Sequence, residues 1–155
     1  MSQEPIISVI VPVYNQEKYI GRCLRSLLDQ SLPRSSYEII IINDGSTDKT
    51  TYALELFKEE IRHLRNKKNK GLAFSVNKGI LNARGRYLIR VDSDDYVNKE
   101  FLKILSFYLM ENPSMDAICC DYLLVDDQEK VHGRKNGIDN PIACGIMFRI
   151  EQIIE

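Results

Sequence analysis

The chain has 155 residues, of which 44% are hydrophobic and 28% charged, and its formal net charge is −1. This composition is typical of one soluble domain with its own core. With 21 basic against 22 acidic residues the chain has no global basic field, so nucleic acid is not an expected partner. Apolar runs stay far below the ~20 residues that span a membrane, and residues 1–5 do not resemble a signal peptide. We therefore expect a cytoplasmic protein without a transmembrane segment.

The sequence offers no thiol or imidazole metal site. Its four cysteines have no spacing typical of a metal or redox pair: Cys23, Cys119, Cys120 and Cys144. Because disulfides are rare in the cytosol, we expect reduced, mostly buried thiols. The two histidines, His63 and His132, are isolated and are expected to be surface or structural residues.

Two nearly continuous apolar runs, at residues 6–13 and 37–42, are typical of strands buried on both faces of a parallel sheet. Pro12 cannot donate to a strand ladder and marks the expected end of the first strand. A helical pattern follows it through about Gln30, with Asn15 as the expected N-cap.

Turn residues end the second run, and either Ser46 or Thr47 is the expected cap of the next helix. Residues 62–65 are expected to form a short strand. Gly71 opens a third helix, which Gly85 ends. The expected apolar face of this helix consists of Leu72, Val76, Ile80 and Ala83.

In the later part of the chain, strands and helices alternate less regularly. Asn98 is the expected cap of a helix with a buried stripe: Phe101, Ile104, Leu105, Tyr108 and Leu109. Residues 117–125 are expected to form a strand that returns as a hairpin through 129–132. A loop at 134–141 and a strand at 142–148 follow.

Strands and helices alternate from residue 6 to about residue 112, which predicts a doubly wound, Rossmann-like α/β fold. We expect a mostly parallel sheet with helices on both faces, in a single domain that covers residues 1–155. Residues 150–155 resemble the first turn of a further helix, so we also expect a chain that is cut short at its C-terminus.

The strand at 87–91 ends in three carboxylates, Asp92, Asp94 and Asp95. Such a concentration of negative charge is costly unless a cation lies nearby. Mg²⁺ and Mn²⁺ prefer carboxylate and phosphate oxygens, and ligands bind at the carboxyl ends of strands in open α/β sheets. The pattern predicts a metal site that grips a phosphorylated substrate, with an acidic solvated loop as the alternative. Arg90 is the expected internal counter-ion.

Three loops, 13–17, 43–46 and 92–95, follow buried strands and are expected at one edge of the sheet, where a single ligand can touch them all. The Asp44 carboxylate can accept from a base N–H, and Tyr14 can stack on a ring, which fits a nucleotide. An ordinary turn at Asp44 and core packing of Tyr14 stay open. The absence of GxGxxG after the first strand and of GxxxxGK[ST] anywhere argues against a dinucleotide-binding fold and a P-loop NTPase.

The chain resembles the nucleotide-binding half of a family 2 glycosyltransferase of the GT-A fold. The resemblance rests on segments in the family's order and spacing: 7–15 with Glu17, 38–48, 69–71 with 77–79, and 85–87 leading to 92–95. Residues 143–149 are similar to the family's segment near the acceptor. The resemblance implies a donor-nucleotide half at residues 6–97 and an incomplete acceptor half at 98–155.

The resemblance also implies a role for each matching position. The donor-nucleotide residues would be Pro12, Tyr14, Glu17, Asp44, Lys70, Gly71, Asn77, Asp92 and Ser93. Asp44 would read the base, most often uracil, and the helix start at Gly71 would favour the anionic nucleotide. Asp92 and Asp94 would hold Mn²⁺ or Mg²⁺, with Asp94 as the direct ligand. A solvated loop for Lys70 and a hydrogen bond within the helix for Asn77 stay open.

The implied activity is metal-dependent transfer of a sugar from a UDP-sugar to a hydroxyl of a saccharide or lipid-linked acceptor, with inversion. Two departures stand out. Val76 replaces an Arg that many members carry, and the general base is expected beyond Glu155, so this chain is expected to be weakly active or inactive. Glu151 and Glu155 precede the expected position of that base.

Other functions stay open. One alternative is a non-catalytic nucleotide-sugar-binding or scaffold domain. Another is a nucleotidyltransferase, which would usually carry a Gly-rich basic loop where this chain has Tyr14-Asn15-Gln16-Glu17. The sugar, the acceptor, peripheral association with the inner face of a membrane, and the oligomeric state also stay open.

Overall fold

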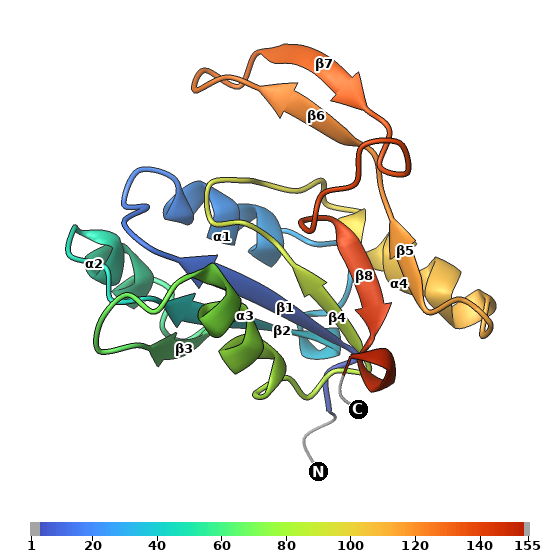
Figure 1. Ribbon diagram of the computed structural model, residues 1–155, viewed down its shortest axis with the longest axis horizontal. Helices are drawn as coiled ribbons and strands as arrows, with labels where there is room; N and C mark the ends of the chain where they lie inside the picture. Colours follow the sequence, from blue (N-terminus) through green and yellow to red (C-terminus); the bar gives the residue numbers. More distant parts are fainter. Residues whose placement is uncertain (1–3, 154–155) are drawn as a thin grey trace.

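The structure of the chain is a computed structural model that describes residues 4–153. Six strands form one sheet in the order β3-β2-β1-β4-β8-β5, and two more form a separate hairpin (Figure 1). The sheet strands are β1 (Ile7–Val13), β2 (Tyr37–Asn43), β3 (Arg62–Arg65), β4 (Tyr87–Arg90), β5 (Ala117–Cys119) and β8 (Ile146–Arg149). The hairpin consists of β6 (Tyr122–Val125) and β7 (Val131–Lys135).

Four helices connect the strands: α1 (Ile20–Leu28), α2 (Thr50–Glu55), α3 (Leu72–Ile80) and α4 (Phe101–Glu111). Strands β3, β2, β1 and β4 are parallel, whereas β8 runs antiparallel to both β4 and β5. The predicted doubly wound α/β fold with a mostly parallel sheet is therefore confirmed. None of the helices in residues 4–153 is long and apolar enough to cross a bilayer.

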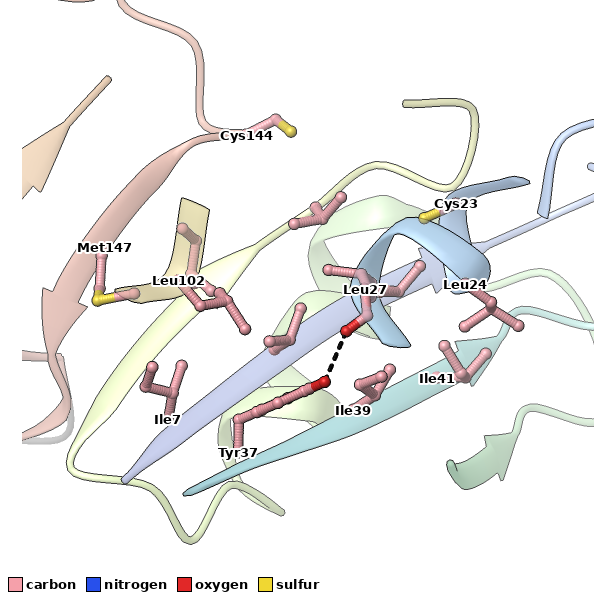
Figure 2. Packing of buried hydrophobic residues seen from close by; sticks show 14 of the residues in the cluster. Ile7, Cys23, Leu24, Leu27, Tyr37, Ile39, Ile41, Leu102, Cys144 and Met147 are labelled. Atoms are coloured by element: carbon pink, nitrogen blue, oxygen red, sulfur yellow. Dashed lines mark hydrogen bonds between the residues drawn. The ribbon is translucent and has the colours of Figure 1, made fainter. Parts of the chain in front are cut away.

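Alternate residues of the central strands bury against different helices. Ile39 and its neighbours on one sheet face share a core with Leu24 and Leu27 of α1 and Leu102 of α4 (Figure 2). The Tyr37 hydroxyl in this core donates to the Leu27 carbonyl at 2.9 Å. This double-sided burial explains why the strands read as continuous apolar runs.

Helix α3 covers the other face, where the smaller apolar cluster consists of Ile10, Ile40, Ile42 and Leu88. The helix lies very close to the sheet, because a Cβ on Gly79 would be 2.6 Å from Cγ2 of Ile10. Its buried residues are Ser75 and Gly79, while Leu72 is 51% exposed, so the predicted apolar face is wrong at Leu72. The small residues Ser75 and Gly79 face the sheet because the backbone of α3 lies too close to it for larger side chains.

The predicted helix starts need correction. α1 begins at Ile20 and α2 at Thr50, so neither Asn15 nor Ser46 or Thr47 caps these helices. In the predicted stripe of α4, Ile104 and Tyr108 are about half exposed and Leu102 is buried instead. The prediction is confirmed at Leu105 and Leu109, which are buried, and at Phe101, which packs against the core. It is wrong at Ile104 and Tyr108, because α4 carries apolar residues on both faces.

The strand boundaries also differ from the prediction. Strand β1 continues past Pro12 to Val13, and its pairing with β4 ends at Ile10, so Pro12 lies beyond that ladder. The strand predicted at 117–125 divides into β5 and β6, with Asp121 between them accepting from the Gly137 N–H at 3.1 Å. β7 extends into the segment predicted as a loop from residue 134.

At the C-terminal end, Ile150–Gln152 form a 3-10 helix that ends at Ile153, and residues 154–155 of the predicted helix lie outside the described residues.

Candidate functional site

The ends of β1, β2 and β4 open onto one cleft of about 320 Å³. These strands are adjacent and parallel, so their carboxyl ends meet at one edge of the sheet, as predicted. The lining residues come from the three strand-end loops and from the start of α3: Pro12, Val13, Tyr14, Gln16, Asp44, Asn69, Gly71, Leu72, Ser75, Arg90, Asp92, Ser93 and Asp94.

The loop after β1 is bound to the loop after β2. Asn15 has a positive φ of 51°, and its Oδ1 accepts from the Thr47 N–H at 2.8 Å. Its own N–H donates to Ser46 Oγ at 3.0 Å, and the Gln16 N–H donates to Thr50 Oγ1 at 2.8 Å. Asn15 therefore holds the neighbouring loop in place instead of capping α1, and Tyr14 is left 43% exposed beside the cleft.

Glu17 belongs to the same connection between the loops. Its Oε2 accepts from the Lys49 N–H at 2.6 Å, and its N–H donates to Asp48 Oδ2 at 3.1 Å. Asp48 Oδ1 in turn accepts from the Thr50 N–H at 2.9 Å at the start of α2. Glu17 is not among the cleft-lining residues, so the structure gives it the supporting role of joining the two loops.

Asp44 is buried at the back of the cleft and organises the loop before α3. Its Oδ1 accepts from Asn66 Nδ2 at 2.7 Å and from the Lys70 N–H at 2.9 Å, and its Oδ2 accepts from the Gly71 N–H at 2.8 Å. Burial alone would raise the pKa of Asp44, but these hydrogen bonds outweigh it and lower the pKa below its usual value. A charged carboxylate with spare lone pairs thus faces the cleft.

Two glycines beside Asp44 have backbone conformations that other residues rarely adopt. Gly45 has a φ of +73°, and a Cβ there would lie 2.7 Å from the carbonyl carbon of Lys68. Gly71, the N-cap of α3, has a φ of +90° and open space around its Cα. These conformations bring the Lys68–Gly71 backbone against Asp44.

Arg90 and Asp92 form a two-point ion pair at the end of β4. Arg90 Nε lies 2.7 Å from Asp92 Oδ1, and Arg90 Nη2 lies 2.9 Å from Asp92 Oδ2. This interaction raises the pKa of Arg90 above its usual value. Arg90 therefore occupies the predicted counter-ion position, and it also lines the cleft.

The residues after Asp92 in the acidic loop differ in their exposure to solvent. Ser93 is buried, whereas Asp94 and Asp95 are exposed residues. Oxygens of Asp92 and Asp95 and the sulfur of Cys144 lie within 4.8 Å of one another. Burial of the carboxyl, with the charges of Asp94 and Asp92, raises the pKa of Asp95.

Two buried thiols lie beneath this loop. Burial raises the pKa of Cys144 well above its usual value and that of Cys23 to about 12, so both thiols stay protonated at neutral pH. The Cys23 thiol also donates to the Asp92 carbonyl at 3.6 Å. All four cysteines of the chain are free thiols.

Seven of the predicted site residues line the cleft: Pro12, Tyr14, Asp44, Gly71, Asp92, Ser93 and Asp94. Glu17, Lys70 and Asn77 do not. Lys70 contributes its backbone N–H to Asp44, while its ammonium lies 5.2 Å from the centre of the Phe74 ring. Asn77 is exposed on α3.

The prediction missed Ser75, which lines the cleft, and Asn66, which donates to Asp44. Asn66 Nδ2 contacts Ser75 Oγ at 3.2 Å as well as Asp44. Ser75 lies four residues after Gly71, which places it on the same side of the helix, and that spacing was the available signal.

Comparison with known proteins shows which family this chain resembles. The family described as Glycosyl transferase family 2 matches residues 8–149. The chain is 35% identical over 130 residues to poly(ribitol-phosphate) beta-N-acetylglucosaminyltransferase TarS of Staphylococcus aureus, a match that covers 82% of this chain and 22% of that protein. It is 38% identical over 112 residues to poly(ribitol-phosphate) beta-glucosyltransferase of Bacillus spizizenii, covering 70% and 18%. The chain thus spans about a fifth of the length of these relatives.

Solved structures agree with this placement. The crystal structure of S. aureus TarS 1-349 in complex with UDP-GlcNAc has a TM-score of 0.81 and 28% identity, covering 95% of this chain and 46% of that chain. The mannosyltransferase PcManGT from Pyrobaculum calidifontis, in complex with GDP-Man and Mn²⁺, has a TM-score of 0.76 at 20% identity, covering 99% and 48%, and shows likeness of fold alone. The predicted GT-A fold is therefore confirmed.

Proposed function

This chain belongs to glycosyl transferase family 2, and from that membership we propose that it binds a UDP-sugar and acts in transfer of the sugar to an acceptor hydroxyl. The observation that carries the proposal is the cleft itself, where Tyr14, Asp44 and Asp94 from three separate strand ends line one space. UDP-GlcNAc is the ligand of the similar TarS structure, which supports a uridine nucleotide as the donor.

The nucleoside half of the donor fits the side of the cleft formed by β1 and β2. Asp44 is charged, and its Oδ2 accepts from the Gly71 N–H, while each carboxylate oxygen can accept more than one bond, which leaves capacity for a base N–H. Tyr14 is 43% exposed and offers a ring face for stacking. The same hydrogen bonds that hold the Lys70–Gly71 backbone fix the Asp44 carboxylate, so base recognition and loop structure depend on one side chain.

The diphosphate half fits the β4 side, and a divalent cation suits the oxygens there. Asp94 is exposed and lines the cleft, whereas both oxygens of Asp92 are held by Arg90, so Asp94 is the better direct ligand. Asp92 retains lone pairs for a second contact. Bound Mn²⁺ or Mg²⁺ would neutralise the charge of the departing diphosphate. Arg90 limits the repulsion between Asp92 and its acidic neighbours.

Inversion would follow from a single displacement. The acceptor oxygen bonds to the anomeric carbon on the face opposite UDP, the carbon–oxygen bond to the diphosphate breaks, and the hydroxyl proton passes to a base. We assign no base in residues 4–153. Glu151, an exposed residue in the turn after β8, is not among the residues that line the cleft. The proposed contribution of this chain is therefore donor binding and orientation of the diphosphate.

A UDP titration tests the proposal. UDP should bind in the presence of Mn²⁺ and lose affinity when a chelator is added. Mutation of a residue that only supports a metal ligand typically lowers metal affinity by about 10–100-fold. Asp94 is proposed as a direct ligand, so Asp94→Asn should weaken Mn²⁺-dependent UDP binding at least as much. Asp116→Asn, at an exposed position before β5, is the matched control. Equal UDP affinity with and without chelator would refute the metal contact, and no UDP binding in either condition would refute the donor site.

A further inference from the structure

Arg22 of α1 connects the acidic loop to the β6–β7 hairpin. Its Nη2 donates to the backbone oxygen of Asp94 at 2.9 Å, and its guanidinium carbon lies 4.6 Å from the centre of the Tyr96 ring. Its Nη1 lies 3.3 Å from Oε1 of Glu129, in the turn of the hairpin. One side chain thus touches two segments that are far apart in the sequence.

The guanidinium is held on several sides. The Arg22 side chain is 23% exposed, and the Tyr19 ring lies 5.6 Å away on α1's N-terminal side. Within residues 4–153, the buried Nε has no hydrogen-bond partner. Because an unpaired buried donor is unfavourable, the other contacts must outweigh it to keep the side chain in this position.

The turn of the hairpin has a second set of contacts with the start of α1. Lys18 Nζ lies 3.1 Å from Oδ2 of Asp127, and the Tyr19 hydroxyl donates to Oδ1 of the same residue at 2.8 Å. Glu129 adopts a φ of +64°, which turns the chain back into β7. Figure 1 shows the hairpin standing apart from the main sheet, so these contacts near its tip are what join that end to the domain.

We propose that Arg22 is a positioning residue for Asp94 and that it links the order of the acidic loop to docking of the hairpin turn. The contact uses the backbone oxygen of Asp94, so the carboxylate stays free for a cation and the diphosphate. Arg90 acts differently, because it binds the carboxylate of Asp92 itself. This inference rests on the role that Asp94 has in the proposed function.

The planar guanidinium suits this position better than an ammonium would. Arginine donates in two directions at once and stacks on an aromatic ring, whereas lysine is a compact point charge. Arg22→Lys should therefore keep the charge but lose the simultaneous contact with Asp94, Glu129 and Tyr96. This difference separates positioning from simple electrostatic attraction of the donor.

The test compares Arg22→Ala, Arg22→Lys and Glu129→Gln with Arg25→Ala, which removes a positive charge from an exposed position one turn further along α1. Arg22→Ala should lower the Mn²⁺-dependent affinity for UDP about tenfold, as loss of one charge-assisted hydrogen bond predicts, with uridine affinity unchanged. Arg22→Lys should fall between Arg22→Ala and the parent chain. Glu129→Gln should lose about two- to threefold, because the Glu129 side chain is 55% exposed and its ion pair is weakened by solvent.

Amide hydrogen exchange at residues 94–97 is the second measurement, and it does not depend on donor binding. These amides should exchange faster in Arg22→Ala and stay unchanged in Arg25→Ala. Identical exchange and identical Mn²⁺–UDP affinity in the two variants would overturn the inference, as would a parallel loss of uridine affinity. If the parent chain bound no UDP, the proposed function would fail, and the exchange rates alone would decide the role of Arg22.

Discussion

The guanidinium of Arg90 covers both carboxylate oxygens of Asp92, two residues further along the chain, at 2.7 and 2.9 Å. The pair lies at the point where β4 ends and the acidic loop begins. It leaves the cleft with one ion-paired carboxylate, Asp92, followed in the chain by the exposed residue Asp94 and by Asp95, whose carboxyl is partly buried.

Arg90→Gln should make the stability of the chain depend on divalent cations. Without the guanidinium, Asp92 repels Asp94 and Asp95, and the chain should lose about 1–3 kcal/mol of unfolding free energy. Mn²⁺ should restore part of that loss. Urea unfolding with Mn²⁺ and with chelator measures this, with Arg65→Gln at an exposed position in β3 as the control. An equal loss in both conditions would show that Arg90 does not compensate the acidic loop.

Asp44→Asn should weaken the binding of uridine as well as that of UDP. The amide is neutral and its nitrogen cannot accept from the Gly71 N–H, which keeps only its 2.9 Å bond to Asn69 Oδ1, and a hydrogen bond to a charged group contributes about 1.5–3 kcal/mol. Calorimetry with uridine, which lacks phosphate, isolates the nucleoside contact from the metal. Unchanged uridine affinity would assign Asp44 to loop structure alone. Asn69→Ala removes the other acceptor of the Gly71 N–H but keeps the Asp44 carboxylate, so it should affect uridine less.

Glu38 should contribute stability that is lost at acidic pH. Burial raises its pKa, but hydrogen bonds from Arg62, Ser8 and Arg84 outweigh the burial and lower it. Because the folded pKa lies below the unfolded value of about 4.3, the stabilisation is complete above that pH and disappears as the pH falls through the folded pKa. Glu38→Gln should therefore destabilise the chain at pH 7 and by a smaller amount near pH 3. Urea midpoints at the two pH values measure this, and a constant difference would contradict it.

Gly45→Ala should destabilise the chain more than Gly71→Ala. Both glycines have positive φ, and the strain of placing alanine there costs about 1–3 kcal/mol. Only at Gly45 would the new methyl group also collide with backbone, at 2.7 Å from the Lys68 carbonyl carbon, which adds about 1–3 kcal/mol. Thermal or urea unfolding of the two variants measures the difference. Equal losses would mean that the loop at Lys68 moves freely.

The central strands and the cleft could be predicted because their signals are local. A strand buried on both faces is continuously apolar, as in β1 and β2, and the polar residues that follow mark the sheet edge. Asp44 and Asp92 were found in this way. The order of β8 and β5 in the sheet had no such signal, because pairing between distant segments leaves no fixed spacing in the sequence.

The roles of Asn15 and Glu17 were not predicted correctly because their side chains accept hydrogen bonds from backbone N–H groups far away in the sequence. Asn15 is a typical helix cap, but its oxygen accepts from Thr47 in the neighbouring loop. Glu17 binds Lys49 for the same reason. Sequence patterns show which groups can accept a hydrogen bond, whereas only the packing of α1 beside α2 determines which donor reaches them first.

The antiparallel position of β8 has a consequence for how this domain can change over time. The chain leaves β4 at Arg90 and returns beside the same strand at Ile146, so residues 91–145 form an excursion that starts and ends at one place and adds β5 at the far side of β8. Within it, the hairpin is joined mainly by its turn and its base. Insertions or replacements in the hairpin can therefore accumulate without altering the register of β1, β2 and β4. The geometry allows this segment to diversify while the frame of the cleft is inherited unchanged.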